Sequence, residues 1–437
     1  MGPAGWRPRT GGIEGVEPLS LILYRAGVAL LEPFTPGLLA RRAAKGKEDA
    51  ARLGERLGRA SAPRPDGPLV WIHSVSVGES QSVLPLIARL RAERPDIAIL
   101  STSGTVTSAA LLARRLPPGA VHQYAPLDTP GAARRFLDHW RPDLAIFVES
   151  ELWPNLILGA KARGARLALL SARITMKTAR GWARVGAAAR RLVGAYDLVM
   201  PQDEASAERL AYFGAQIAGR LNLKLVGEPL PCDPDALARL RAAIGARPVV
   251  LAASTHAGEE ALIAEAARQA IDRAAPGALL IIAPRHPDRR DEVLSAIGED
   301  WGQIAVRSRG EAPDGGTRLY LADTLGEMGL FFRLADVVVM GGGFVPGVGG
   351  HNPLEPARLA RPVISGPEVF NAAELYGAMA GRGAMIAADG PALSEALAGL
   401  LADPARARAM GEAGLAFAKD QSAALDAAWG ELEGLLP

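Results

Sequence analysis

The sequence has little cysteine, few aromatic side chains and almost no net charge. The single cysteine, Cys232, cannot form a disulfide within the chain, and it excludes a cysteine-based zinc site. Aromatic residues make up 5% of the 437 residues, whereas 49% are apolar, which supports a large buried core and excludes a disordered chain. The formal charge of +2 arises without a long basic run, so nucleic-acid binding is disfavoured. These features predict a globular protein of two or three domains in a reducing compartment.

The N-terminal part also lacks an apolar run long enough to cross a bilayer. The run Leu19–Leu31 is interrupted by Arg25 and is shorter than the roughly 20 residues of a membrane-spanning helix. Cations follow it, which is typical of a helix in the headgroup region of a membrane: Arg41, Arg42, Lys45 and Lys47. We therefore expect residues 1–60 to form a helical segment attached to the cytoplasmic face of a membrane. A helix packed on its own domain is the alternative.

Short β-branched runs alternate with long stretches of helical spacing after a proline-rich joint at residues 61–68, and this alternation predicts parallel sheets. The series occurs twice, and residues 227–234, with three prolines, separate the two as a linker. The strands predicted in the first series are 69–75, 97–102, 144–148, 167–170 and 198–200, and those in the second are 249–253, 279–283, 319–321, 337–340 and 363–364.

The predicted fold is therefore α/β, with two Rossmann-like, doubly wound parallel-sheet domains. Residues 61–226 would form the first domain, and residues 227–437 the second, which would end in Ala-rich helices at roughly 404 to 432. Such sheets bind ligands at the carboxyl ends of their strands, so two domains that face each other would place their ligands across a common cleft.

A glycine-dense loop follows the predicted strand 337–340 and leads into Asn352-Pro353, which is typical of a helix N-cap and first turn. Glycines let the backbone approach a ligand, and a helix start favours a phosphate. Glu355 stands one turn later, where it could accept hydrogen bonds from a ribose. Arg285, just beyond the strand 279–283, could bind phosphate oxygens. The alternatives are a long turn with a well-capped helix and a solvated surface arginine.

Acidic residues mark strand ends in the first domain. Glu79 follows the first strand and opens a helix, where partial desolvation can raise its pKa toward that of a general base, although partnership with the helix dipole is the commoner role. Glu149 and Glu151 follow the strand 144–148, an unusual place for charge unless it is used or paired. His73 lies within a strand and is predicted to be a hydrogen-bonded core residue. Asp233-Pro-Asp235 fits a turn and cap better than a metal site.

In their order along the chain, these and further motifs resemble those of bacterial 3-deoxy-D-manno-octulosonic acid (Kdo) transferases of lipopolysaccharide synthesis. The resemblance covers roughly residues 20 to 420. It rests on residues 73–79 (His-Ser-Val-Ser-Val-Gly-Glu), 124–128, 149–154 (Glu-Ser-Glu-Leu-Trp-Pro), 222–224, 254–259, 284–287, 326–328 and 341–356.

The resemblance implies a GT-B fold and an inverting transfer of Kdo from CMP-Kdo to the lipid A precursor, tetraacyldisaccharide 4'-phosphate, at the inner membrane. It implies that Glu79 is the general base and that Glu149 and Lys224 stabilise the transition state. It assigns CMP binding to Pro284, Arg285, Gly326, Glu327, Met328, Asn352, Pro353, Leu354 and Glu355. A helix N-terminus and a cation can stabilise the departing phosphate, so we expect neither a metal nor a cofactor besides the donor substrate.

Two other classes of function share such a fold. A nucleotide-sugar 2-epimerase would bind a nucleotide at the same glycine loop without a lipid acceptor. A membrane-associated nucleotide-binding scaffold is disfavoured, because the acidic and the phosphate-binding candidates fall in separate domains. The sequence leaves open the number of Kdo units transferred, the acyl pattern recognised and the oligomeric state.

Overall fold

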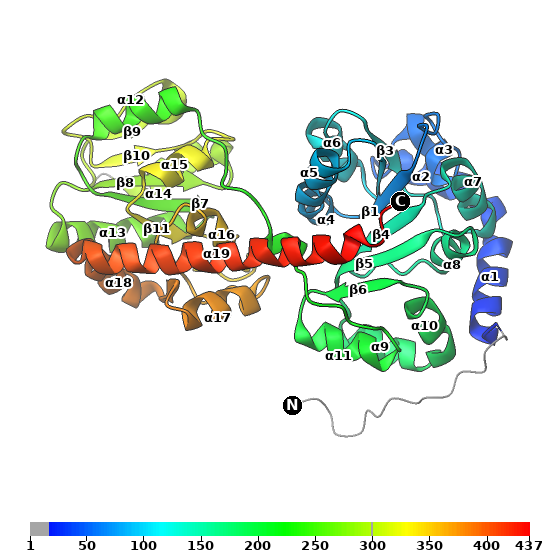
Figure 1. Ribbon diagram of the computed structural model, residues 1–437. Coiled ribbons are helices and arrows are strands. Elements are labelled where there is room, and N and C mark those ends of the chain that lie inside the picture. Colours follow the sequence, from blue (N-terminus) through cyan, green and yellow to red (C-terminus); the bar gives the residue numbers. More distant parts are fainter. Residues whose placement is uncertain (1–16, 299) are drawn as a thin grey trace. The chain divides into compact units, whose positions relative to one another are not determined.

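The computed structural model describes residues 17–298 and 300–437 and has two compact units, each of which contains one sheet (Figure 1). Unit 1 extends to Gly227 and also includes Gln421–Pro437, and unit 2 comprises Glu228–Asp420. In both units every pairing between neighbouring strands is parallel, as the alternation of strands and helices predicts.

The sheet of unit 1 has six strands in the order β3-β2-β1-β4-β5-β6, so the chain direction across the sheet reverses between β1 and β4. In a doubly wound sheet this reversal is the switch point, where ligands bind at the carboxyl ends of the strands. The strands are β1 (Leu69–His73), β2 (Ala98–Ser103), β3 (Ala120–Tyr124), β4 (Leu144–Val148), β5 (Arg166–Ala172) and β6 (Leu198–Pro201).

Helices cover both faces of this sheet, because successive strand residues point to opposite faces. Trp71 of β1 packs with Phe136 and Phe147 on one face, and its neighbour Ile72 packs with Leu86 on the other. The helices after β1 are α4 (Val77–Ser82), α5 (Leu84–Glu93), α6 (Val106–Arg115), α7 (Pro130–Trp140), α8 (Pro154–Ala162), α9 (Met176–Ala183), α10 (Gly186–Val193), α11 (Glu204–Tyr212) and the 3-10 turn η3 (Leu223–Leu225).

The sheet of unit 2 has seven strands in the order β13-β12-β11-β7-β8-β10-β9, and its switch point lies between β7 and β11. The loop after each of these two strands therefore lies beside the other. The strands are β7 (Val249–Thr255), β8 (Leu279–Pro284), β9 (Ile304–Val306), β10 (Leu319–Leu321), β11 (Val337–Met340), β12 (Val363–Ser365) and β13 (Met385–Ala387).

Helices also flank the second sheet (Figure 1). They are α12 (Pro234–Ile244), α13 (Glu259–Ala274), η4 (Pro287–Arg289), α14 (Arg290–Ile297), η5 (Arg307–Arg309), α15 (Met328–Leu334), α16 (Leu354–Ala357), α17 (Ala373–Gly381), α18 (Gly390–Ala402) and α19 (Pro404–Glu433).

All ten predicted strands are present with ends within two residues of the prediction, whereas β3, β9 and β13 were not predicted. The three missed strands are all edge strands of their sheets. β9 and β13 have only three residues each, and β3 is half polar and only partly buried. An edge strand has one neighbour and less need of a continuous apolar run, so its sequence signal is weak.

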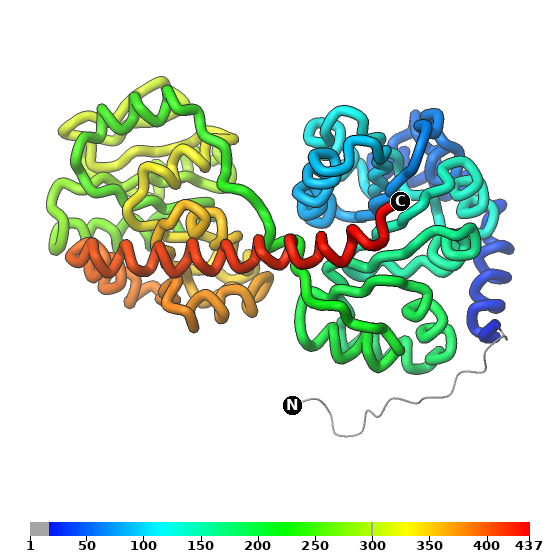
Figure 2. Tube along the Cα trace, viewed as in Figure 1, coloured from blue at the N-terminus to red at the C-terminus, as the bar shows by residue number. Residues whose placement is uncertain are grey.

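The C-terminal helix differs from the predicted division of the chain. Residues 404–433 form the single helix α19, drawn without interruption in Figure 2, and residues 421–437 belong to unit 1 instead of the second domain. Leu425, Trp429 and Leu432 are buried in the unit 1 core. The predicted second domain, 227–437, therefore loses its last 17 residues, because the apolar stripe of the helix end is buried on the first sheet.

The N-terminal helices pack on unit 1 and also expose apolar side chains. They are α1 (Leu19–Leu31), η1 (Glu32–Phe34), α2 (Thr35–Ala43), η2 (Ala50–Arg52) and α3 (Leu53–Arg56). Leu21 is buried, and the hydroxyl of Tyr24 donates to Oδ2 of Asp128 at 2.9 Å. The large exposed apolar side chains, which we call the N-terminal apolar face, are Leu19, Ile22, Leu23, Leu30, Leu31, Phe34 and Leu38.

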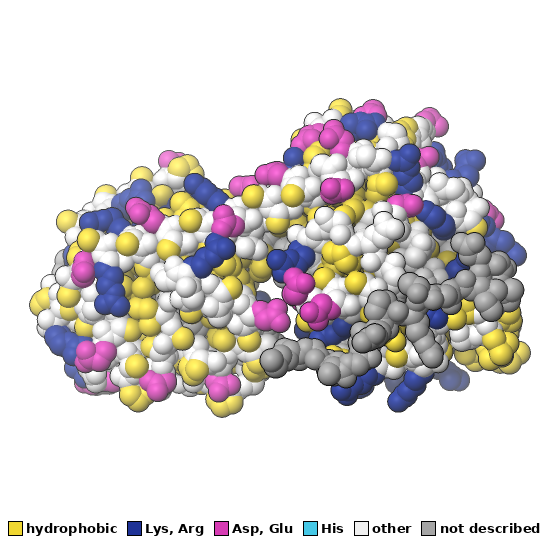
Figure 3. Space-filling model, turned by 60° about the horizontal axis from the view of Figure 1, so that its bottom comes forward, with side chains coloured by type: hydrophobic (Ala, Val, Ile, Leu, Met, Phe, Trp, Pro, Cys, Tyr) yellow, Lys and Arg dark blue, Asp and Glu magenta, His cyan; other side chains and the backbone are white. Residues whose placement is uncertain are grey.

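In Figure 3, hydrophobic side chains gather at the right-hand edge of the view, on the side where Figure 1 labels α1. Within residues 17–298 and 300–437, no helix has both the length and the apolar character needed to cross a membrane.

Candidate functional site

Glu79 lies in the first turn of α4, directly after the central strand β1. Ser76 caps this helix, since its hydroxyl oxygen accepts from the amide of Glu79, and it donates in turn to Oε1 of Glu79 at 2.8 Å. Oε2 of Glu79 accepts from the amide of Val75 at 2.8 Å. The carboxylate thus closes a capping interaction, as the alternative interpretation of the sequence expects, and still has lone pairs for a substrate hydroxyl.

Burial is the main cause that raises the pKa of Glu79 above 4.5, and the nearby carboxylates of Glu149 and Glu151 raise it further. The hydrogen bonds from Val75 and Ser76 oppose the shift. A carboxylate with a raised pKa is a stronger base than an exposed one, so Glu79 has the electrostatic environment that proton abstraction requires.

Glu149 follows β4 on the other side of the switch point and has a positive φ of 58°. A side chain in this left-handed region costs about 1–3 kcal/mol, and such residues cluster at functional sites. Nζ of Lys224 lies 2.5 Å from Oε1 of Glu149. The carboxylate of Glu149 at this strand end is therefore paired with Lys224, which is one of the two explanations that the sequence offered for a charge at this position.

The position of Lys224 depends on one local and one long-range hydrogen bond. The side chain of Asn222 caps the 3-10 turn η3 by accepting from the amide of Lys224 at 3.1 Å. The hydroxyl of Ser171, near the end of β5, accepts from the amide of Leu223 at 3.3 Å and fastens η3 to the carboxyl edge of the sheet. Glu79, Glu149 and Lys224, which the resemblance assigns to catalysis, are thus all at one edge of unit 1.

His73 is buried beneath this edge, as predicted. Its Nδ1 lies 2.9 Å from Oγ1 of Thr102, which also accepts from the indole of Trp71, and its Nε2 faces Oε2 of Glu151 at 3.9 Å. The indole of Trp153 donates to the same oxygen of Glu151 at 2.5 Å. Glu151 is therefore held by neighbours, and sequence reasoning gave it no role.

In unit 2 the glycine loop after β11 is folded around the carboxylate of Glu259. This side chain is fully buried in the first turn of α13, where the helix dipole favours a negative charge. Its Oε2 accepts from the amides of Gly342 at 2.7 Å and His256 at 2.9 Å, and its Oε1 accepts from that of Phe344 at 2.9 Å. Two amides of the loop, those of Gly342 and Phe344, therefore bind a protein side chain and are not available to a phosphate.

Glycine is required in this loop by close packing. A Cβ on Gly341 would lie 2.6 Å from the carbonyl oxygen of Ser254, and one on Gly342, whose φ is +77°, would lie 2.9 Å from His351. Gly341 is thus pressed against the end of β7, and Gly342 against a side chain of its own loop. These two glycines therefore serve the packing of the loop at the switch point, and approach to a ligand is a separate use.

Two histidines pair at this switch point. Nε2 of His256 lies 2.8 Å from Nε2 of His351, with the rings stacked, so one nitrogen must donate and the other must accept. Burial is the main cause that lowers both pKa values, that of His351 to about 4, and Arg285 lowers both further. Sequence reasoning gave neither histidine a role.

The residues assigned to CMP come from three strand ends of unit 2. Pro284 ends β8, and the exposed Arg285 follows it, with its amide bonded to the carbonyl of Thr255 at 2.9 Å. Burial raises the pKa of Glu355, against the influence of Arg358 and Arg285. Arg285 and Glu355 are therefore close enough to influence each other.

The helix predicted to start at Asn352 is short. α16 is a single turn that begins at Leu354, and Oδ1 of Asn352 accepts from the amide of Leu354 at 3.1 Å. Gly326 has a φ of +84°, and Met328 begins α15. The carboxylate of Glu327 between them bonds Nη2 of Arg307 at 2.6 Å, which lowers its pKa.

Among the described residues, no group of three or more His, Cys, Asp or Glu side chains could hold a metal ion. Asp233 caps α12 through the amides of Asp235 and Ala236, as the turn-and-cap interpretation predicted.

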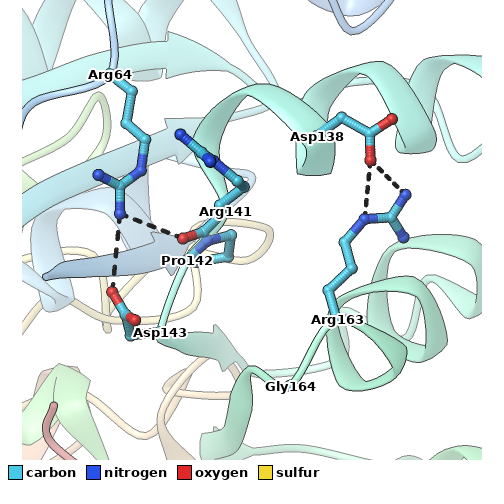
Figure 4. Close-up of a pocket in the computed structure, with 7 residues that line it drawn as sticks. All are labelled: Arg64, Asp138, Arg141, Pro142, Asp143, Arg163 and Gly164. Atoms are coloured by element: carbon cyan, nitrogen blue, oxygen red, sulfur yellow. Dashed lines mark hydrogen bonds and ion pairs between the residues drawn. The ribbon is translucent and has the colours of Figure 1, made fainter.

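A cavity of about 590 Å³ opens at the opposite edge of the unit 1 sheet (Figure 4). Its lining includes Asp143, which directly precedes β4. Arg64 reaches Asp143 at 3.9 Å and the carbonyl oxygen of Arg141 at 3.5 Å, and Arg163 pairs with Asp138 at 2.6 Å. The cavity thus lies at the amino ends of the strands, and two of its three arginines are paired with carboxylates. It is not part of the candidate site.

Comparison with known proteins agrees with this geometry. A family model described as 3-deoxy-D-manno-octulosonic-acid transferase (kdotransferase) matches residues 51–226. The 3-deoxy-D-manno-octulosonic acid transferase of Bordetella pertussis is 36% identical over 378 residues, which cover 83% of this chain and 86% of that protein. The chain belongs to the Kdo transferase family. It is therefore a glycosyltransferase, and the family predicted from the ordered motifs is confirmed.

Solved structures confirm the GT-B fold. A glycosyltransferase from Rickettsia africae has a TM-score of 0.55 at 11% identity and covers 85% of this chain and 98% of its own. The UDP-GlcNAc 2-epimerase from Neisseria meningitidis, bound to UDP-GlcNAc, has a TM-score of 0.52 at 12% identity, with 82% and 99% covered. At such identities the likeness shows the fold alone, so it does not indicate that this chain is a nucleotide-sugar 2-epimerase.

Proposed function

We propose that this Kdo transferase moves Kdo from CMP-Kdo to the lipid A precursor, tetraacyldisaccharide 4'-phosphate, with inversion and release of CMP. The observation that carries the proposal is the buried carboxylate of Glu79 at the switch point of unit 1, with a raised pKa and the pair of Glu149 and Lys224 across the same switch point. A doubly wound sheet binds its ligand at the switch point, and a general base must lie within hydrogen-bonding distance of the hydroxyl that it deprotonates.

In the proposed step, Glu79 removes the proton from an acceptor hydroxyl as the hydroxyl oxygen attacks the anomeric carbon of Kdo. The bond from that carbon to the phosphate oxygen of CMP breaks, and its electron pair leaves with CMP. One displacement of this kind inverts the anomeric carbon. Lys224, held by Glu149, supplies positive charge to the transition state at the edge of unit 1.

Unit 2 would hold the donor through Pro284, Arg285, the segment Gly326–Met328 and the segment Asn352–Glu355. The Arg285 guanidinium would bind the phosphate, and its position directly after β8 supports this role. Glu355 would accept hydrogen bonds from the ribose. The charge on departing CMP would be balanced by these groups, so the proposed step uses no metal ion or cofactor.

We place the enzyme on the cytoplasmic face of the inner membrane through the N-terminal apolar face. Apolar side chains of this kind bind at the headgroup boundary, and Arg41 and Arg42 in the last turn of α2 add attraction to anionic lipid. A cavity of about 700 Å³ beside this face is lined mostly by apolar side chains, among them Leu31, Phe34 and Trp153, and could receive acyl chains of the acceptor.

The test is the isosteric variant Glu79→Gln, because its amide oxygen can still accept from the Val75 amide and so preserve the helix cap. Loss of a general base typically lowers the rate by about 10²- to 10⁴-fold. We expect transfer of Kdo from CMP-Kdo to the acylated disaccharide, followed by mass spectrometry, to fall by this factor. Binding of CMP-Kdo, measured by calorimetry, should be unchanged. Turnover at the wild-type rate would remove Glu79 as the base.

A further inference from the structure

The segment between Leu152 and Tyr196 contains nine Lys or Arg and no Asp or Glu. The whole chain has nearly equal numbers of bases and acids, so this is a strong local departure. Three of the nine have partners elsewhere in unit 1: Lys161 pairs with Asp197, Arg163 with Asp138, and Arg166 with the carbonyl of Gly434.

Four of the others form one exposed group after β5, which we call the α9 cationic patch: Arg173, Lys177, Arg180 and Arg184. Three of them are spaced three and four residues apart and share a face of the helix, while Ala179 is its buried side. None of these four side chains forms an ion pair or hydrogen bond with a residue in 17–298 or 300–437. Like charges at this spacing repel one another, so the patch is unfavourable until an anion binds.

The patch begins at the candidate catalytic edge. The amide of Arg173 donates to the carbonyl of Glu149 at 3.3 Å, and the hydroxyl of Ser150 donates to the carbonyl of Arg173 at 2.6 Å. The next residue, Ile174, is fixed through its amide to Ser206 and through its carbonyl to Arg209. The backbone that carries the patch is thus tied to the loop that carries Glu149, so an anion bound here lies on the acceptor side.

We infer that the α9 cationic patch binds the phosphate group of the lipid acceptor and orients the acceptor for transfer. The inference rests on the proposed function, and it adds to that function a binding site for the phosphate group of the acceptor. Arginine and lysine bind phosphate monoesters, and because the backbone that carries them is fixed, only their side chains must be ordered on binding. The link to Glu149 favours a substrate over the bilayer surface as the source of the phosphate.

The variant K177Q/R180Q/R184Q removes three charges from the patch and keeps helical residues in α9. The matched control, R114Q/R115Q/R134Q, removes from α6 and α7 of the same unit three exposed charges that have no ion pair with a described residue. Each exposed charge pair contributes about 0.2–1 kcal/mol, so the loss of three pairs weakens binding by roughly 3- to 150-fold. Binding to detergent micelles with tetraacyldisaccharide 4'-phosphate should weaken by this factor in the patch variant and stay near wild type in the control.

The readouts separate a phosphate site from a structural role. Micelles with the dephosphorylated disaccharide should bind both variants alike, CMP affinity should not change, and added salt should reduce the difference between the patch variant and wild type. Equal binding of wild type to the two lipids would overturn the inference. So would a patch variant that binds the phosphorylated lipid normally but sediments less with phosphatidylglycerol vesicles, because the patch would then serve the bilayer. Intact lipid binding without any Kdo transfer by wild type would instead refute the proposed function.

Discussion

Replacement of Glu259 by glutamine tests whether one buried carboxylate holds the glycine loop of unit 2. Wild-type Glu259 offers only acceptor oxygens to the amides of His256, Gly342 and Phe344. Glutamine keeps one acceptor oxygen and places an NH2 group against at least one of these N–H donors. That donor loses a bond to a charged group and remains buried without a partner, so we expect a loss of about 2–4 kcal/mol of unfolding free energy.

For a unit of this size, such a loss lowers the midpoint of thermal unfolding by roughly 5 to 15 °C. The loop it fixes lies at the switch point beside His351 and Arg285, so CMP binding should also weaken, by about tenfold or more. The assays are calorimetric unfolding of the full chain and titration with CMP.

Glu260→Gln is the matched control. Glu260 is equally buried in the same helical turn, but it contacts Arg289 at 2.9 Å and Thr255 at 3.3 Å instead of the loop. We expect Glu260→Gln to lower stability and to leave CMP affinity near wild type. If Glu259→Gln unfolds at the wild-type temperature and binds CMP normally, or if both variants lose CMP affinity equally, the carboxylate does not position the loop.

Three further predictions follow from other contacts. Arg285→Ala should raise the KM for CMP-Kdo at least about tenfold with little change in kcat, because the proposed charge-assisted contact with the phosphate would be lost; an unchanged KM would exclude it from donor binding. The folded-state pKa of His351, about 4, lies below its unfolded value of 6.5, so its stabilising contribution is present above pH 6.5 and is lost as pH falls from 6.5 toward 4. Urea unfolding at several pH values should therefore show a steeper decline in wild type than in His351→Gln, and identical declines would contradict this assignment. Trp429→Ala, which empties a buried site in the core of unit 1, should cost about 3–5 kcal/mol of unfolding free energy by urea titration, and a loss below 1 kcal/mol would show that the helix end is not part of that core.

The sequence predicted the parts of the fold that depend on local pattern. Buried parallel strands are apolar along their whole length, which is why the central strands were found and the edge strands β3, β9 and β13 were missed. The cap at Asp233 was predicted because it needs only a few neighbouring residues. The family was found from an ordered set of motifs, which is also a property of the chain read from end to end.

Long-range partners were not predictable, because local pattern does not specify which distant residue will complete a hydrogen bond. Glu259 was noted as the last residue of the motif 254–259, and its bond to Gly342, 83 residues away, exists only because β7 and β11 are neighbours in the sheet. The only signal in the sequence was a glutamate at the start of a long helix, with a glycine-rich segment elsewhere in the chain. The pairing of Lys224 with Glu149 likewise depends on Ser171, which no motif marked.

The sequence by itself determined the segments that can hold functional residues in this protein. Strand ends, glycine loops and helix caps each depend on the local backbone preferences of a short stretch of residues. Tertiary structure alone decided which of those places share a partner, and it also decided that the last 17 residues complete the core of unit 1. The physical reason is that burial and hydrogen bonding act between groups that are near in space, and only strand order brings residues far apart in the chain to that distance.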